Sequence, residues 1–210
     1  MILNPLTYAL LAQDAYSAIP QIGEESSSAR AIIQSTIDGT AFAFPGTDNV
    51  ACWLADLDCA VADTPLGRIH KGFNDAAMSI VSMLERQATA TPGQIVLCGH
   101  SEGAALALII GGYLCKAGRP PLAIFAFEPP RVTTDDRLGA VLQRNSVKLS
   151  LYRQGFDVVP LVPRMIEPWQ HPAPLTQIGE PAEPFPNVID HMIERVVAAI
   201  RVFVGGQVPA

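Results

Sequence analysis

One stretch of the chain has the residue types and spacing of a catalytic turn. Residues 99–103 read GHSEG, a G-x-S-x-G pattern with an apolar run before it and a helix-like run after it. Between a strand and a helix, such a turn lifts the serine hydroxyl above the sheet edge and points the first helix amides at the same space. A side chain at Gly99 or Gly103 would clash with the neighbouring strand and helix. We therefore expect Ser101 to be a nucleophile, and the alternative is a serine that only caps the helix.

A serine nucleophile needs a histidine as its base. In chains with this kind of turn, the acid and then the histidine follow the serine. That order removes His70, which precedes the turn. His100 is adjacent to the serine, and we expect it to point away. His171 and His191 remain as candidates.

The base in turn needs a carboxylate to orient it. Asp157 follows a predicted strand, at the sheet edge where sites of such folds gather. Its alternative role is to form the turn before Val158. Asp190 is next to His191, but consecutive residues of a helix do not face each other, so we expect it to orient His191 poorly.

Strands and helices alternate along the chain, which positions these groups. Apolar periodicity and turn signals predict helices over residues 5–18, 73–88, 102–118, 134–144 and 187–204, and strands over 30–37, 40–46, 94–99, 121–129 and 147–155. A proline-rich stretch covers residues 160–186. We predict one α/β domain, residues 1–210, with a mainly parallel sheet covered by helices on both faces.

Composition limits the classes of partner. Hydrophobic residues make up 49% of the 210 residues and charged residues 16%, which is typical of a packed globular chain. The net charge is −6 and no basic cluster stands out, so nucleic acid and anionic membrane surfaces are poor partners. No apolar run reaches the length of a membrane span, and the N-terminus lacks the positive region of a signal peptide, so we expect a cytoplasmic protein.

The four cysteines show no zinc-type spacing, and we expect no metal. Cys98 and Cys115 lie in apolar runs and are predicted to be buried thiols. A disulfide between Cys52 and Cys59 stays open as an alternative.

Five segments, taken in order, resemble motifs of the class 3 lipase family, which includes the fungal triacylglycerol lipases. The segment AFAFPGTDNVACWLADLD resembles the family's F-R-G-T segment and lid, and RIHKGFNDAA resembles its V-H-x-G-F segment. The segment LCGHSEGAALA resembles the family's G-H-S-L-G-G-A-L-A turn. The last two, FAFEPPRV and YRQGFDVVPLVP, resemble its F-G-S-P-R-V segment and its Y-R-x-x-x-x-D-x-V-P segment. The resemblance covers about residues 6–200. It implies the α/β-hydrolase fold with a short lid segment.

Carried over position by position, the resemblance implies Ser101 as nucleophile, Asp157 as acid and His191 as base. It also implies that the backbone amides of Thr47 and Glu102 form the oxyanion hole. His171, in WQHPAPLTQIG, matches a strand segment that precedes the family's catalytic histidine.

Three departures from the family bear on the site. Pro45 stands where a basic residue is usual, so any ion pair made by that residue is missing. Glu102 replaces leucine or glutamine and brings a carboxylate near the developing oxyanion, so we expect it to turn toward solvent or a basic partner such as Arg131. Glu128 stands where glycine or alanine is frequent, and it is either a surface carboxylate or a group near the site.

The predicted lid places Val50, Trp53, Leu54 and Leu57 at helical spacing, with acidic residues elsewhere. Trp53 is either a permanent core anchor or a lid contact that faces solvent when the lid opens. Val50, Trp53 and Leu54 are the candidate substrate-binding residues.

Together these features predict a carboxylic ester hydrolase, favoured as a lipase acting on lipid acyl esters through an acyl-enzyme intermediate, with no cofactor. A lipid or small ester is the expected partner, with transient contact to a lipid interface. The alternatives are a soluble short-chain or feruloyl-type esterase and a catalytically inactive binding module.

Overall fold

A six-stranded sheet forms the centre of the molecule. The computed structural model describes residues 3–47, 49–56, 58–164 and 167–206. Within them the strand order is β1 (Ile32–Thr36), β2 (Gly39–Phe44), β5 (Ile95–His100), β6 (Ala123–Phe127), β7 (Lys148–Gln154) and β8 (Leu175–Ile178). Only β1 is antiparallel to its neighbour in this sheet; the other pairs are parallel. The parallel strands therefore all end at one edge.

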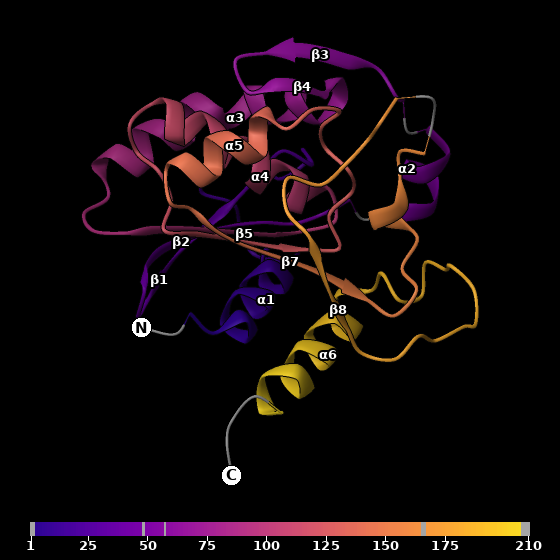
Figure 1. Cartoon of the computed structure of the whole chain (residues 1–210). Coiled ribbons are helices and arrows are strands. Elements are labelled where there is room, and N and C mark those ends of the chain that lie inside the picture. Colours follow the sequence, from indigo (N-terminus) through magenta and orange to yellow (C-terminus); the bar gives the residue numbers. More distant parts are fainter. Residues whose placement is uncertain (1–2, 48, 57, 165–166, 207–210) are drawn as a thin grey trace.

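Helices cover both faces of the sheet, as the sequence predicts (Figure 1). One face carries α3 (Lys71–Ala90), α4 (Glu102–Lys116) and α5 (Arg137–Arg144), and the other carries α1 (Pro5–Asp14) and α6 (Ile193–Gly205). Each face has its own hydrophobic core. Burial on both faces explains why β6 and residues 95–98 of β5 are apolar throughout rather than alternating.

Smaller elements lie around the sheet edge. They are α2 (Val50–Asp56), the hairpin of β3 (Val61–Thr64) and β4 (Gly67–His70), and the short helix η1 (Val159–Leu161). The apolar periodicity of the sequence does not predict this hairpin, because the two four-residue strands mix polar and apolar side chains. It also missed β8, which is four residues long and lies inside the proline-rich stretch.

The last helix starts later than predicted, and this changes the position of one candidate. It begins at Ile193 rather than at residue 187, because a turn held by the Asn187 side chain precedes it. Asn187 Oδ1 accepts a hydrogen bond from the Asp190 backbone N–H at 2.9 Å. His191 therefore lies on the turn before the helix, not on the helix itself.

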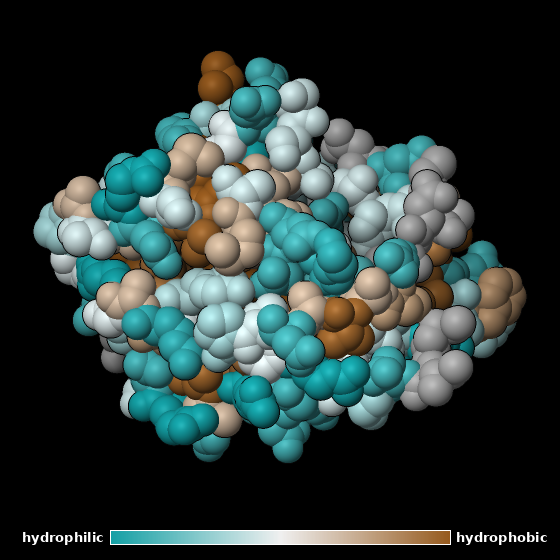
Figure 2. Space-filling model, turned by 90° about the horizontal axis from the view of Figure 1, so that it is seen from above, coloured by the Kyte–Doolittle hydropathy of each residue, from teal (hydrophilic) through white to brown (hydrophobic). Residues whose placement is uncertain are grey.

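The face seen from above carries hydrophobic residues only as separate patches among hydrophilic ones (Figure 2). No helix in the described ranges is both long and apolar enough to cross a membrane.

Candidate active site

Ser101 lies on a strained turn between β5 and α4. Its backbone has φ 57° and ψ −126°, a conformation that costs a non-glycine residue roughly 1–3 kcal/mol. A Cβ on Gly99 would lie 2.3 Å from the Gly103 carbonyl oxygen, and one on Gly103 would lie 2.3 Å from the Phe44 carbonyl oxygen. The two glycines are therefore required by close backbone approach, as the sequence indicates.

Asp157 and His191 meet at the sheet edge beside this turn. Asp157 follows β7, and its Oδ2 lies 2.6 Å from Nδ1 of His191. Asp157 Oδ1 accepts a hydrogen bond from the Val159 backbone N–H at 2.9 Å. Because the carboxylate accepts from Nδ1–H, the neutral imidazole keeps Nε2 unprotonated. This is the protonation state that a general base requires.

The two atoms that would exchange a proton are both buried and unpaired. Ser101 Oγ and His191 Nε2 have no hydrogen-bond partner among the described residues. Ser101 and Asp157 are 0% exposed and His191 is 2% exposed. Buried polar atoms are normally paired, so these two mark a place where a substrate could complete the bonding. The assignment of the three residues as a triad stays a prediction.

We expected His100 to point away from the site, but its side chain contacts His191. Its ring lies 4.7 Å from the His191 ring, and its Nε2 donates a hydrogen bond to the His191 carbonyl oxygen at 2.9 Å. Its Nδ1 therefore accepts from the Tyr16 hydroxyl, at 2.6 Å. Burial, and next the neighbouring His191, lower the pKa of His100 well below its usual value. A neutral His100 thus helps to hold the backbone of His191.

The other sequence candidates have separate roles. Asp190 is turned to Phe156, Ala182 and Asn187, from which its carboxylate accepts hydrogen bonds. The reason given for setting it aside, a shared helix with His191, is wrong, since neither residue is helical. His70 caps α3 by accepting from the Phe73 backbone N–H.

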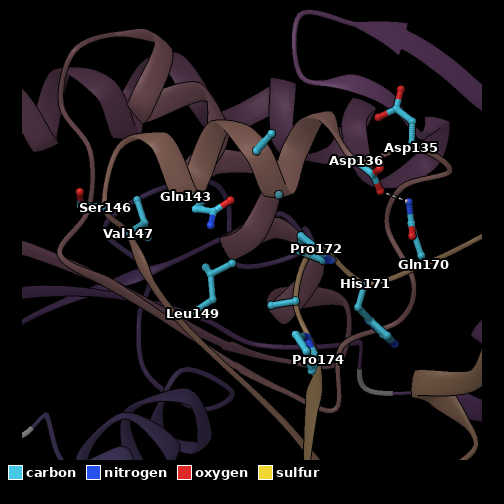
Figure 3. A pocket seen from close by; sticks show the side chains of 13 residues that line it. Asp135, Asp136, Gln143, Ser146, Val147, Leu149, Gln170, His171, Pro172 and Pro174 are labelled. Carbon is cyan, nitrogen blue, oxygen red and sulfur yellow. Dashed lines mark hydrogen bonds between the residues drawn. The ribbon is translucent and has the colours of Figure 1, made fainter.

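His171 lies elsewhere, beside a hollow of about 610 Å³ between α5 and residues 170–174 (Figure 3). Its Nε2 hydrogen-bonds to the Pro160 carbonyl oxygen at 2.9 Å, and burial lowers its pKa to about 4. At one end of this hollow, Gln170 donates a hydrogen bond to Asp136 at 3.1 Å, as Figure 3 shows.

Thr47 and Glu102 both border the serine. Thr47 lines a cleft of about 640 Å³ together with His100 and His191, and Glu102 is the first residue of α4. Their amides are correctly placed in the chain for an oxyanion hole, and that role stays a prediction. The segment before Thr47 packs tightly, since a Cβ on Gly46 would lie 2.7 Å from the Ser101 Cβ.

The expectation for the Glu102 side chain is wrong. It turns neither to solvent nor to Arg131; it is buried and accepts a hydrogen bond from the Ser28 hydroxyl at 3.2 Å. Burial raises the pKa of Glu102. Arg131 instead donates to the carbonyl oxygens of Val162 and Pro163. Residues before β1, far from α4 in sequence, therefore determine the environment of Glu102.

Three of the predicted lid residues, Val50, Trp53 and Leu54, lie on α2, and they differ in what they contact. Val50 lines the cleft beside His191. Trp53 packs on the core and stacks on Phe73 with ring centroids 5.9 Å apart, which favours the core-anchor alternative. Leu54 is half-buried. Leu57 lies outside the described residues.

Two of the four cysteines lie in the core of the protein. Cys98 and Cys115 are buried thiols, as predicted, and burial raises the pKa of Cys115 to about 11. The side chain of Cys52 lies outside the described residues, so the pairing with Cys59 stays open.

The sequence left two positions open for Glu128, a surface carboxylate and a group near the site. It is 0% exposed, so the alternative of a surface carboxylate is wrong. One ligand atom each of Glu128, Asp157 and His191 lie within 4.8 Å of one another, a spacing that could also suit a metal ion. Asp157 and His191 are joined directly by a hydrogen bond of 2.6 Å, so we interpret the group as a hydrogen-bonded cluster.

Comparison with known families agrees with this geometry. The model of the family "Lipase (class 3)" matches residues 41–167, which is more than half of the chain. The chain belongs to the class 3 lipase family. The match covers the strained turn and Asp157 but ends before His191.

A curated relative matches this class 3 lipase chain at low sequence identity. The secreted mono- and diacylglycerol lipase 1 of Fusarium solani is 29% identical over 137 residues, covering 61% of this chain. The matched part spans 40% of that relative's length.

Solved structures show the same fold. Rhizomucor miehei triacylglyceride lipase matches with a TM-score of 0.68 and 18% identity, over 90% of this chain and 92% of that one. A mutant form of MDLA from Penicillium cyclopium matches with a TM-score of 0.64 and 21% identity, over 90% and 82%. These neighbours identify the α/β-hydrolase fold.

Proposed function

We propose that this chain hydrolyses carboxylic esters, with lipid acyl esters as substrates. The observation that carries the proposal is the buried Asp157–His191 hydrogen bond of 2.6 Å beside a serine held on a strained turn. In this arrangement His191 can accept the proton of Ser101 while Asp157 stabilises the imidazolium that forms.

The reaction follows from these positions. Ser101 Oγ attacks the ester carbonyl carbon, and its proton passes to His191 Nε2. The carbon–oxygen bond to the alcohol breaks as His191 returns the proton to the leaving oxygen, which leaves an acyl group on Ser101. Water then attacks this acyl-enzyme with His191 as base and releases the acid. The amides of Thr47 and Glu102 would stabilise the negatively charged oxygen.

The cleft beside His191 supports an apolar acyl group. Its volume of about 640 Å³ falls within the usual range for small-molecule sites, and its lining includes the apolar residues Val50, Val188, Ile189, Met192 and Ile193. Three of these residues, Val188, Ile189 and Met192, are also exposed to solvent. Such exposed apolar side chains could make transient contact with a lipid surface.

The same cleft also suits a shorter ester, so a short-chain or feruloyl-type esterase is the second candidate. The similar Fusarium protein is named for mono- and diacylglycerols, which supports partial glycerides as the first natural class to test.

Hydrolysis of p-nitrophenyl esters from acetate to palmitate tests both candidates, with Ser101→Ala as the control. Turnover that rises with acyl length and disappears in Ser101→Ala supports a lipid acyl esterase. A maximum at acetate supports the short-chain alternative, and hydrolysis that persists in the folded Ser101→Ala variant contradicts the serine mechanism.

A further inference from the structure

Glu128 has features that the three-residue site does not use. It lies at the carboxyl end of β6, next to the strand that leads to Asp157, and its carboxyl group is fully buried. Its backbone has φ 52°, a left-handed conformation that is uncommon for a residue with a side chain. A glycine would adopt this conformation without strain. A strained, buried glutamate beside the catalytic group therefore calls for a chemical role.

The two oxygens of Glu128 have different surroundings. Oε1 accepts a hydrogen bond from the Gln154 backbone N–H at 2.5 Å. Oε2 is buried and no described group donates to it. A ligand atom of Glu128 also lies within 4.8 Å of one of Asp157, so the two buried carboxyl groups are neighbours. Two ionised carboxylates cannot hydrogen-bond to each other, so one of the pair must carry a proton for this contact to be favourable.

Charge decides which carboxyl group is protonated. Both oxygens of Asp157 already accept hydrogen bonds, Oδ1 from Val159 N–H and Oδ2 from His191. Glu128 receives a single backbone hydrogen bond, and the cation acting on it is Arg153. Burial, and next the charge of Asp157, hold the pKa of Glu128 well above its usual range. The proton therefore belongs on Glu128.

We propose that Glu128 is a neutral carboxylic acid that donates a hydrogen bond to Asp157 and so positions the Asp157–His191 pair. The chain of contacts then runs from Glu128 through Asp157 to His191 and Ser101. Glu128 touches neither the substrate nor the reacting atoms, so it is a positioning residue. The inference rests on the proposed function only for its kinetic consequences, since the protonation state exists without substrate.

A hydrogen bond from Glu128 withdraws charge from Asp157. Without it, Asp157 would stabilise the imidazolium form of His191 more strongly, and the base would be lost at a higher pH. Other titratable groups face the cluster: Arg153 beside Glu128, and His100 against the His191 ring. Asp190, in the turn before α6, is paired with Arg195 at 3.2 Å. The substitutions at Glu128 described next leave Arg153, His100 and Asp190 unchanged. A difference in pH profile between the variants therefore comes from residue 128.

Two substitutions separate the possible roles of Glu128. In Glu128→Gln, the side-chain oxygen can still accept from Gln154 and the amide can donate to Asp157, so glutamine imitates a protonated glutamate. In Glu128→Leu, both bonds are lost with little change in volume. We expect Glu128→Leu to lower kcat about 10- to 100-fold with KM within about threefold, and to move the acid limb of kcat/KM to higher pH. Glu128→Gln is expected to rescue most of this loss and to return the limb toward the wild-type position.

Two results in the pH profiles of these variants would contradict the proposed role of Glu128. If Glu128 were ionised, Glu128→Gln would remove a negative charge near His191, and the acid limb would move to lower pH. If Glu128 were only a packing group, Glu128→Leu would leave the limb in place whatever its effect on kcat. Either result overturns the proposal.

An infrared measurement tests the proton itself, without substrate or turnover. The difference spectrum of wild type minus Glu128→Gln at neutral pH should contain the carbonyl band of a protonated carboxylic acid. A carboxylate band in its place would overturn the proposal. If no ester proves to be a substrate, or Glu128→Leu does not fold, this spectrum still decides the question, so failure of the proposed function is distinguishable from failure of this inference.

Discussion

Two hollows of similar size have a histidine in their walls, but only one of them has the groups for a reaction. The cleft beside His191 has a volume of about 640 Å³, and the hollow beside His171 has about 610 Å³. At the first, Asp157 orients the imidazole and Ser101 lies close by on its strained turn. At the second, the imidazole hydrogen-bonds to the carbonyl oxygen of Pro160. Convergent polar groups, not volume, therefore distinguish the active-site candidate.

The largest expected difference between the two regions is in activity. His191→Ala should lower kcat by several orders of magnitude, because the serine loses its base. His171→Ala should cost less than tenfold, because His171 contacts no group of the site. Rates on a p-nitrophenyl ester, with folding checked by circular dichroism, measure both. The reverse ranking would move the base to His171 and break the comparison.

A smaller difference should appear in stability at acid pH. The pKa of His171 in the folded protein is about 4 because of burial, below the ordinary value of 6.5. The unfolded chain therefore binds the proton first, and the stabilising contribution, complete above pH 6.5, is lost as pH falls toward 4. We expect a loss of roughly 1–3 kcal/mol from this group.

Urea unfolding of wild type and His171→Gln at several pH values measures this effect. The variant should lose less stability than wild type between pH 7 and pH 4. Equal losses in the two proteins would show that His171 does not titrate as its burial indicates.

The smallest effect is expected at Glu102, within the His191 region. Its amide does not depend on the side chain, and glutamine can still accept the hydrogen bond from Ser28. Glu102→Gln should therefore keep activity within about tenfold, roughly 1.4 kcal/mol of barrier. Ser28→Ala is the matched control, since it removes the hydrogen bond that Glu102→Gln retains. A loss beyond a hundredfold in folded Glu102→Gln, with Ser28→Ala active, would mean that the carboxyl group takes part in the reaction.

Local patterns were enough to predict the parts of the molecule that depend on short-range sequence. The turn at Ser101, the sheet with helices on both faces and the burial of Cys98 follow from spacing and apolar runs. The sequence also indicated the two residues that the structure brings together, Asp157 and His191.

Long-range packing decided the rest. The buried Glu102 contacts Ser28 in the loop before β1, and Arg30 closes that loop through the carbonyl oxygens of Glu25 and Ser27. Glu128 is buried by a left-handed backbone at a strand end, and no periodicity signals that conformation. The turn before α6 looked helical because its apolar residues face the cleft at nearly helical spacing.

The central claim is that Ser101 is an activated nucleophile, and covalent labelling tests it most directly. A fluorophosphonate probe reacts with serines that have a base and an oxyanion hole, and peptide mass spectrometry locates the adduct. We expect one adduct per chain on the peptide that contains Ser101, formed in wild type and His171→Ala but not in His191→Ala. Labelling at another residue, or ester hydrolysis by a protein whose Ser101 stays unlabelled, would contradict the account.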